Sequence, residues 1–427
     1  MKVAVIGATG FIGGAVCARL AGDGHRVLGI VHSEASTCFP CAEMVVIDVG
    51  KAEQADWTAA LNGVDAVVNC AGVLQDSATE QVSSVHSVGA SVLFAACEET
   101  GIKRFVHFSA IGVDREQPSS FSASKFAGDQ ALMRTDLDWI VLRPSVVLGA
   151  PVFGASALIR GLAALRWLPS MPGTAPLQPV QLEDVVSTVV HFLDEGSRSK
   201  ITIDLPGPDT YSLDALVAKY RAWMGWPPAR RFELPSWLAN GLYRLGDVAG
   251  LLGWRPPVRS NAEKEMRRGA MGDPAGWTEV TGIIPTAVDA ALRTRPATVQ
   301  DRWFAGLYFI KPLIFSVLPF FWIMTGIISL TVGWDSGVEL MVVAGAGILS
   351  GPSVIAGALA DMAVGVLIAW RRTARLGVLG ALALSGFYAV AGSILRPDLW
   401  AEPLGPLMKI LPIVLLHLVA LAILEER

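Results

Sequence analysis

Apolar residues in the first 150 positions form short continuous runs that alternate with segments of helical periodicity. Helical spacing is clear over residues 11–21 and 82–100, and a further helix carries Lys125. Strands that are apolar on both faces are typical of a parallel sheet covered by helices on both sides. The sequence therefore predicts an α/β fold built from βαβ units, a doubly wound parallel sheet. Its predicted strands are residues 3–6, 27–31, 45–49, 66–69, 104–109 and 139–142.

The pattern loosens between residues 151 and 295, where proline and tryptophan are frequent. We expect a smaller substrate lobe here and place the domain boundaries at 1–210, 211–300 and 301–427. Within the lobe, residues 237–252 form an amphipathic segment with few charges. That segment is expected to pack against the sheet domain, to roof a pocket or to lie on a bilayer.

Beyond residue 300 the chain contains long uncharged apolar runs. A helix of about 20 apolar residues crosses the hydrocarbon core of a bilayer. The shorter glycine-rich piece at 338–349 is predicted to be interfacial or re-entrant. The sequence therefore predicts an all-α four-helix transmembrane bundle with spans at 313–332, 353–370, 376–395 and 404–424.

Charge around these runs predicts their orientation. Arg371, Arg372 and Arg375 lie between the second and third runs, and clustered basic residues favour the cytoplasmic side. The chain starts directly with a strand-like run and lacks the pattern of a signal peptide. We therefore expect an integral protein of the cytoplasmic membrane, with its first domain and both termini in the cytoplasm.

Composition narrows the classes of partner. Hydrophobic residues make up 52% of the chain and charged residues 17%, against about 25% charged in a typical soluble domain. The net charge of -4 shows no basic excess, so no nucleic acid is expected to bind. The lipid bilayer is the expected partner, together with a lipophilic small molecule and a membrane protein as further candidates.

The five cysteines all precede residue 98 and are expected to be reduced thiols. Cys38 and Cys41 form a CxxC pair with His32 nearby, which suggests a redox or metal site. A redox CxxC normally opens a helix, and zinc needs four ligands, so we expect neither disulfide nor metal.

A glycine-rich loop directly follows the first predicted strand and opens a helix. Glycines allow a tight turn and a close approach of a pyrophosphate, and the helix N-terminus offers free N–H groups and a partial positive charge. In this βαβ context the pattern predicts a dinucleotide site, NAD or NADP. Its residues are Gly7, Thr9, Gly10, Phe11, Ile12 and Gly13.

Other strand ends supply the remaining candidate nucleotide contacts. The second strand ends in His32 and Ser33 without a carboxylate, which favours NADP, with Glu34 as the alternative that would serve NAD. Asp48 and Val49 are expected near the adenine, although Asp48 is equally interpreted as a loop cap. The ribose and pyrophosphate are assigned to Cys70, Ala71 and Gly72.

Five motifs together resemble the short-chain dehydrogenase/reductase superfamily: GATGFIG, NCAG, FSAIG, FSASK and LRPSVVLG. The resemblance covers about residues 1–210 and is strongest to extended and atypical members, including the group of the nucleotide-binding accessory subunit of respiratory complex I. It implies a Rossmann fold and adds Pro144 to the cofactor-binding positions.

That family transfers protons with the tyrosine and lysine of a YxxxK motif and a serine from the preceding strand. The matching residues here are Phe121, Lys125 and Ser109, so the hydroxyl of the general acid is missing. Lys125 is still expected to bind the nicotinamide ribose. Two interpretations follow, an oxidoreductase acting on a lipophilic or quinone-type acceptor and a non-catalytic structural, assembly or redox-sensing protein. Substitute proton donors would have to come from Ser119, Ser120, Ser122, Ser124 or Tyr211.

The last third of the chain resembles the DoxX-like membrane family, most clearly over residues 397–409. Relatives of that family include quinone-linked membrane redox proteins. Asp361 and Lys409 stand at membrane depth, where charge is costly. Lys409 is expected to reach the interface, and Asp361 to face the bundle interior, as a structural partner or in a binding or proton-relay role.

Overall fold

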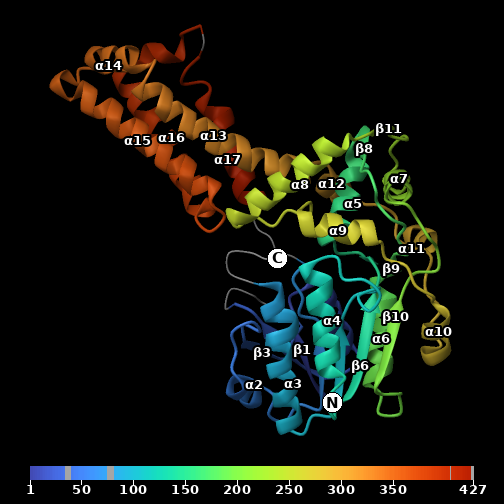
Figure 1. Cartoon of the computed structure of the whole chain (residues 1–427). Helices are drawn as coiled ribbons and strands as arrows, with labels where there is room; N and C mark the ends of the chain where they lie inside the picture. Colours follow the sequence, from blue (N-terminus) through green and yellow to red (C-terminus); the bar gives the residue numbers. More distant parts are fainter. Residues whose placement is uncertain (34–39, 75–80, 404, 425–427) are drawn as a thin grey trace. The chain divides into compact units, whose positions relative to one another are not determined.

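The computed structural model describes residues 1–33, 40–74, 81–403 and 405–424. The chain forms two compact units, one of residues 1–250 with 255–305 and one of residues 251–254 with 306–427. We call them the sheet unit and the helical unit (Figure 1). The division at residue 210 falls inside the sheet unit and stays a prediction.

A seven-stranded sheet forms the centre of the sheet unit, and every strand pair in it is parallel. The spatial order is β10-β6-β5-β4-β1-β2-β3, so the direction of winding reverses between β1 and β4. Nucleotides bind at such a reversal, outside the carboxyl ends of the strands. The predicted Rossmann fold is thus confirmed, with strands β1 (Lys2–Ile6), β2 (Arg26–Val31), β3 (Glu43–Val46), β4 (Ala66–Asn69), β5 (Arg104–Phe108), β6 (Asp138–Pro144) and β10 (Ile201–Leu205).

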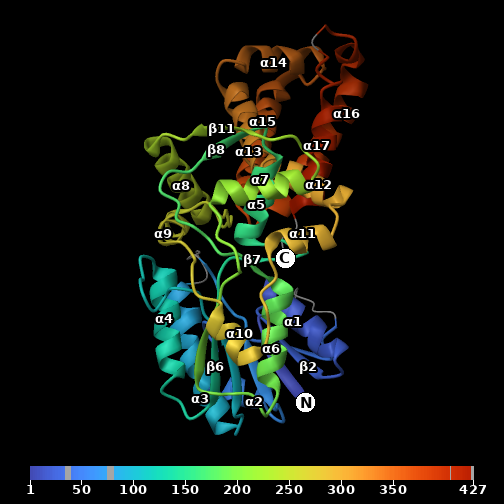
Figure 2. The ribbon, with the colours of Figure 1, turned by 90° about the vertical axis from the view of Figure 1, so that its right-hand side faces the viewer.

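Helices cover both faces of the sheet, so a separate hydrophobic core lies on each face (Figure 2). Val3 and Val5 of β1 pack in the core that α1 and α6 cover, whereas Ala4 and Ile6 pack in the core on the opposite face. Successive side chains of a strand point to opposite faces, which is why both had to be apolar. The covering helices are α1 (Phe11–Gly22) and α6 (Leu182–Leu193) on one face and α2 (Gln54–Ala60), α3 (Gly89–Glu99) and α4 (Ser120–Leu132) on the other.

Most of the remaining elements of the sheet unit gather at the carboxyl ends of the strands, while α10 packs beside β10 and α6 (Figure 1). A buried ion pair between Arg160 of α5 and Asp301 of α12, 2.7 Å long, connects distant parts of this region. The guanidinium of Arg160 also lies 5.4 Å from the ring centre of Trp223 in α7. The elements are β7 (Val147–Leu148), α5 (Gly154–Ala164), β8 (Trp167–Ser170), β9 (Val180–Gln181), α7 (Leu213–Trp223), β11 (Arg230–Glu233), α8 (Ser236–Leu251), α9 (Ser260–Arg268), α10 (Ala275–Thr281), α11 (Val288–Thr294) and α12 (Val299–Leu307).

The helical unit consists of α13 (Ile310–Leu330), α14 (Trp334–Val343), α15 (Ser350–Ala369), α16 (Ala374–Leu395) and α17 (Ile410–Leu424). Within the described residues, three of these regions are long and apolar enough to cross a membrane: α13, α15 with the short turn before it, and α16. The prediction for the fourth span needs correction at its start, because α17 begins six residues later than expected and has 15 residues in the described part of the chain. The piece expected to be interfacial or re-entrant is α14 followed by a 3₁₀ turn at Gly347–Leu349.

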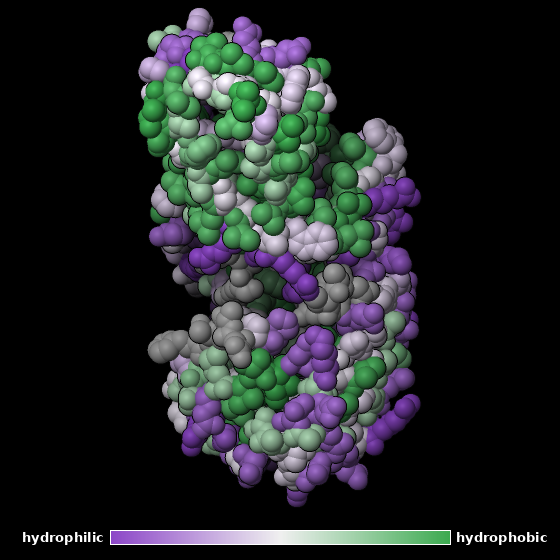
Figure 3. All heavy atoms as spheres, turned by 90° about the vertical axis from the view of Figure 1, so that its left-hand side faces the viewer, coloured by the Kyte–Doolittle hydropathy of each residue, from purple (hydrophilic) through white to green (hydrophobic). Residues whose placement is uncertain are grey.

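Small residues bring α13 and α15 into close contact. A side chain at Gly326 would meet the carbonyl oxygen of Ala358 at 2.5 Å, and one at Gly365 would meet that of Pro319 at 2.9 Å. Such contacts are typical of helices packed within membranes. The outer surface of this unit is largely hydrophobic in the view of Figure 3.

Two polar pairs lie inside the helical unit. Tyr388 donates a hydrogen bond to Oδ1 of Asp361 over 2.9 Å, and the indole N–H of Trp322 donates to Nε2 of His417 over 2.9 Å. Asp361 is buried as predicted, with Tyr388 as a hydrogen-bond partner, and its binding or proton-relay role stays a prediction. Lys409 is exposed and immediately precedes α17.

The segment 251–254, which begins with the last residue of α8, belongs to the helical unit. The N–H of Arg371 donates to the carbonyl of Leu252 over 3.0 Å, and the indole N–H of Trp254 donates to the carbonyl of Ala369 over 2.9 Å. The ring of Trp254 also packs on Phe315 of α13. The chain therefore enters the helical unit twice.

Candidate functional site

The loop between β1 and α1 has the geometry of a cradle for a diphosphate. Gly7 has a φ of +74°, a backbone conformation that residues with a side chain rarely adopt. A side chain at Gly13 would place its Cβ 2.1 Å from the carbonyl oxygen of Gly7. Among the residues that the structure describes, no side chain caps α1 at Gly10, and no acidic residue lies in the first turn of this helix. The helix N-terminus therefore remains available to an anion, and Thr9, Phe11 and Ile12 lie on the same turn.

The loop after β4 runs beside this cradle. A Cβ at Gly7 would lie 3.2 Å from the carbonyl oxygen of Cys70. Asn69 fixes the path of this loop, because its Oδ1 accepts a hydrogen bond from the N–H of Ala71 over 3.1 Å. A Cβ at Gly72 would lie 3.3 Å from Nζ of Lys125. The fold therefore brings together the predicted residues 7–13, 70–72 and 125.

The predicted contacts to the adenosine half are less uniform. His32 is exposed at the end of β2. Asp48 caps its own loop, since it accepts hydrogen bonds from Lys51 at 2.6 Å and from the N–H of Gly50 at 3.1 Å. Partial burial acts to raise the pKa of Asp48, but these hydrogen bonds lower it overall. Contact of Asp48 with adenine stays a prediction.

Three further predicted positions complete the list. Val49 is buried, and its carbonyl would lie 2.0 Å from a Cβ placed on Gly89 of α3. Pro144 is buried at the end of β6. The alternative nucleotide contact Glu34 and the cysteine Cys38 lie outside the described residues, while Ser33 ends the described segment after β2.

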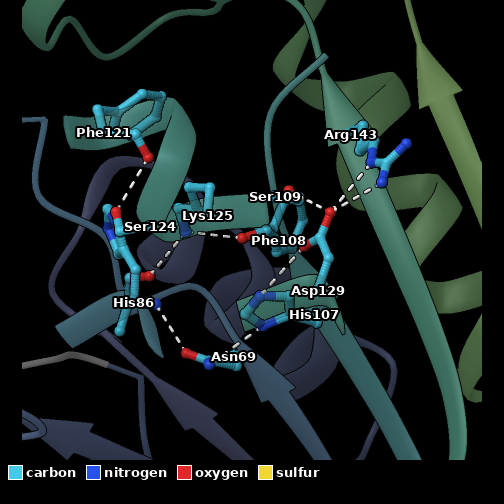
Figure 4. Close-up of polar contacts among 11 residues, drawn as sticks. Asn69, His86, His107, Phe108, Ser109, Phe121, Ser124, Lys125, Asp129 and Arg143 are labelled. Atoms are coloured by element: carbon cyan, nitrogen blue, oxygen red, sulfur yellow. Dashed lines mark hydrogen bonds and ion pairs between the residues drawn. The ribbon is translucent and has the colours of Figure 1, made fainter. Parts of the chain in front are cut away.

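Lys125 lies on α4 with its ammonium group buried near the carboxyl ends of β4 and β5 (Figure 4). Nζ donates to the carbonyl of Phe108 over 2.8 Å and to that of Ala71 over 3.3 Å. Burial lowers the pKa of Lys125 to about 8, while Asp129 and Cys70 act in the opposite direction. The amine is therefore held in place without the tyrosine of the family motif.

Phe121 takes the position of that tyrosine and packs its ring edge-on against His86, with ring centres 5.6 Å apart. Nε2 of His86 accepts from the N–H of Val73 over 3.0 Å, so the ring proton lies on Nδ1, which faces Ser124 at 3.0 Å. The Ser124 hydroxyl donates in turn to the carbonyl of Phe121. Burial lowers the pKa of His86 well below its usual value, so the ring is neutral. His86 thus ties the loop after β4 to α4.

Ser109, the serine that matches the family motif, is hydrogen-bonded to a buried carboxylate (Figure 4). Its hydroxyl donates to Oδ2 of Asp129 over 2.9 Å, and Arg143 donates to the same oxygen from Nε and Nη2 at 3.1 and 3.0 Å. Burial raises the pKa of Asp129, while Arg143 and Ser109 work against that shift. Oδ1 of Asp129 lies 3.8 Å from Nε2 of His107.

The other hydroxyls considered as proton donors already have partners. Ser119 donates to Glu265 of α9 over 2.5 Å, and Ser122 completes the cap at the start of α4. Ser120 accepts from Asn261, and Tyr211 donates to Asp209 over 3.1 Å. These contacts leave their role as acids a prediction.

Sequence reasoning missed the buried polar residues that support the site: Asn69, His86, His107, Asp129 and Arg143. The described part of the chain contains no group of three or more metal-ligating side chains, and within it Cys70 and Cys97 are free thiols.

Known families match both units. The NAD(P)H-binding family matches residues 7–158, and the DoxX-like family matches residues 319–418. Ceramide reductase of Caulobacter vibrioides is 28% identical over 237 residues, which are 55% of this chain and 74% of that protein. Subunit 9 of the NADH dehydrogenase [ubiquinone] 1 alpha subcomplex from mouse is 22% identical over 298 residues, 67% of this chain and 77% of that protein.

Solved structures show the same fold. MoeE5 in complex with UDP-glucuronic acid and NAD has a TM-score of 0.54 and 17% identity, covering 69% of this chain and 97% of that one. WbmG of Bordetella bronchiseptica in complex with NAD has a TM-score of 0.54 and 15% identity, covering 72% and 95%. The chain therefore combines an NAD(P)H-binding domain of the short-chain dehydrogenase/reductase type with a C-terminal DoxX-like domain.

Proposed function

We propose that this protein is a membrane-anchored oxidoreductase that uses NAD(P)H to reduce a lipophilic acceptor of quinone type. The observation that carries the proposal is the pairing of a buried, held Lys125 with a phenylalanine at position 121. The nucleotide side of the family site is kept, whereas the hydroxyl that protonates a carbonyl product is gone.

The residues present fit the nucleotide. Gly7 and Gly13 leave room that a Cβ would fill, and the open N-terminus of α1 suits a diphosphate. When bound, the reduced nicotinamide supplies a hydride. Lys125 is positioned to hold the ribose hydroxyls. His32 and Ser33 stand where the second strand of an NAD enzyme usually ends in a carboxylate, which favours NADP, while the following Glu34 is the alternative that would serve NAD.

The missing acid favours one class of acceptor. Hydride addition to a ketone gives an alkoxide, a strong base that needs a positioned proton donor. Hydride addition to a quinone gives a phenolate instead, whose conjugate acid has a pKa of about 10, like that of tyrosine. Water protonates such a phenolate readily without a positioned donor, so a quinone tolerates both Phe121 and the engagement of Ser109 with Asp129.

Two relatives support a lipophilic acceptor. One is named as a ceramide reductase and another as a subunit of NADH dehydrogenase [ubiquinone], so their names refer to a lipid and to a quinone. The fused apolar helices keep this chain at a bilayer, where such molecules dissolve. Arg371, Arg372 and Arg375 favour the cytoplasmic membrane with the sheet unit in the cytoplasm.

The test is NADPH and NADH oxidation by the purified full-length chain in lipid nanodiscs, with a panel of quinones and of long-chain ketones. We expect turnover with quinones, and we expect Lys125→Met to reduce it. If the protein bound the nucleotide but no acceptor in either panel oxidised it, that result would contradict the proposal.

The second candidate is a non-catalytic nucleotide-binding protein with a structural, assembly or redox-sensing role toward a membrane protein. The hydrogen bond between Ser109 and Asp129 favours it, because two of the three family residues are then unavailable for proton transfer. Tight binding of nucleotide with no turnover is the result that this candidate predicts.

A further inference from the structure

Helix α8 exposes a stripe of apolar side chains. Trp237 is 75% exposed, Leu245 66% and Val248 55%. At 100° per residue these side chains lie on one side of the helix, next to Leu238 and Leu242, which are also exposed. We call these five residues the α8 stripe. Exposed apolar patches of this kind mark sites that bind a protein or a membrane.

The opposite side of α8 is already packed. Ala239 and Tyr243 form a small core with Leu234. A side chain at Gly246 would meet the carbonyl oxygen of Val258 at 1.9 Å. The helix therefore cannot turn its stripe inward without losing these contacts.

The chain that leaves α8 leads directly into the helical unit. Leu251, the last residue of α8, starts the segment 251–254 that belongs to that unit. Within it, Trp254 is hydrogen-bonded to Ala369, the last residue of α15. Because α15 is a membrane-crossing helix by length and composition, the end of α8 is tethered to the end of a span.

Basic side chains lie beside the stripe. Arg244 comes seven residues after Trp237 and so falls next to it on the helix. Arg244, Lys264 and Arg267 line one pocket between α8 and α9. Arg267 pairs with Glu263 at 2.7 Å, whereas Arg244 and Lys264 form no ion pair with any residue that the structure describes. Two positive charges therefore remain for an anion.

We propose that α8 lies in the surface of the bilayer, with the α8 stripe at the boundary between headgroups and acyl chains. Arg244 and Lys264 then meet the phosphates of anionic phospholipids. An apolar face with tryptophan, bordered by basic residues, is the pattern of interfacial helices. The sheet unit thereby makes its own contact with the membrane, separate from the membrane-crossing helices and independent of whether the nucleotide site is catalytic.

The test places the environment-sensitive dye NBD on Leu245→Cys in the full chain, reconstituted in nanodiscs of phosphatidylcholine and phosphatidylglycerol. The control is Ala59→Cys, exposed on α2, and labelling of the parent chain corrects for native cysteines. Nitroxide-bearing lipids are expected to quench the dye at 245 several-fold more than at 59. Val248→Cys gives a second position if the first variant does not fold. Equal quenching at 245 and 59, or a blue shift without quenching by lipid, would overturn the proposal, the latter by showing that protein covers the stripe.

A second arm tests the charges. Combining Leu245→Cys with Arg244→Glu and Lys264→Glu is expected to reduce lipid quenching at least twofold in nanodiscs that contain phosphatidylglycerol. In phosphatidylcholine alone the same substitutions are expected to change little. Equal effects in both lipids would exclude recognition of anionic headgroups.

Discussion

The hydroxyl of Ser109 donates to Oδ2 of Asp129 over 2.9 Å, and the same oxygen accepts a hydrogen bond from the guanidinium of Arg143. In the family the corresponding serine works with a tyrosine on the substrate carbonyl. Here its proton is directed toward a buried anion, on the side of α4 that carries Asp129. The site therefore differs from an ordinary carbonyl reductase at two positions and not only at Phe121.

Phe121→Tyr is expected to leave nucleotide affinity within about twofold, because the Lys125 amine is held by backbone carbonyls and not by residue 121. A restored general acid contributes about 10² to 10⁴ in rate. We expect a gain in ketone reduction below that range, since Ser109 stays engaged, with quinone-dependent oxidation unchanged. The measurement is NADPH oxidation with both acceptor panels. A loss of quinone turnover would instead show that Phe121 shapes the native acceptor site.

Gly13→Val is expected to abolish nucleotide binding, because its Cβ would lie 2.1 Å from the carbonyl oxygen of Gly7. A ligand at a hundred times its dissociation constant stabilises a protein by about 2.7 kcal/mol, so the parent should show a clear thermal shift with NADPH. Gly22→Ala, at the other end of α1 with no atom near its Cβ, is the control and should keep that shift. Retained binding in Gly13→Val would contradict the assignment of the diphosphate site.

Nucleotide affinity is expected to fall above pH 8. The pKa of Lys125 is lowered to about 8 by burial, so its protonated fraction decreases as the pH rises through that value. A charged donor contributes roughly 1.5–3 kcal/mol to a hydrogen bond. The dissociation constant should therefore rise by up to about tenfold per pH unit above 8.

Lys125→Met is the control for this pH dependence. It should bind nucleotide about 10- to 100-fold more weakly at neutral pH, which is the same free energy expressed as a ratio. Its affinity should not change between pH 7 and 10. Parallel pH profiles for the two chains would mean that another group titrates.

Asp129→Ala is expected to destabilise the sheet unit by about 3–5 kcal/mol, because it leaves the buried guanidinium of Arg143 without its inner partner. Asp23→Ala removes an exposed pair with Arg19 and should cost below about 1 kcal/mol. Hydrogen exchange of the amides in β5 and β6 measures the loss of stability in each of the two variants. Similar protection in the two variants would show that Asp129 is not a central support.

Local patterns were sufficient to predict the nucleotide loop and every strand of the seven-stranded sheet except β10. Runs such as residues 27–31 and 66–68 contain no polar side chain because helices cover both faces of the sheet. The loop at Gly7 is likewise a local feature, since the turn and the start of α1 are formed by consecutive residues.

The supporting polar residues had no such local signal. Asp129 meets Ser109 and Arg143 only because α4 crosses β5 and β6, which the strand order makes neighbours. His86 is an isolated histidine on a helical segment, and only the fold brings it to Val73 and Ser124.

Hydropathy predicted the first three spans better than the last. Gly405 adopts a positive φ of +52°, and Pro406 follows it. Glycine in this conformation and proline both interrupt helices, so α17 begins only at Ile410. An average over apolar residues does not register such a break.

The helical unit contains two separate parts of the chain, residues 251–254 and 306–427, and this limits where the protein can be cut into fragments. A fragment that stops at residue 305 would still carry Leu251–Trp254, while Phe315, Ala369 and Arg371 would be missing. Trp254 would then be presented to water without its ring partner or its hydrogen-bond acceptor. A soluble version of the nucleotide-binding half therefore requires excision of this internal strap as well as removal of the C-terminal helices.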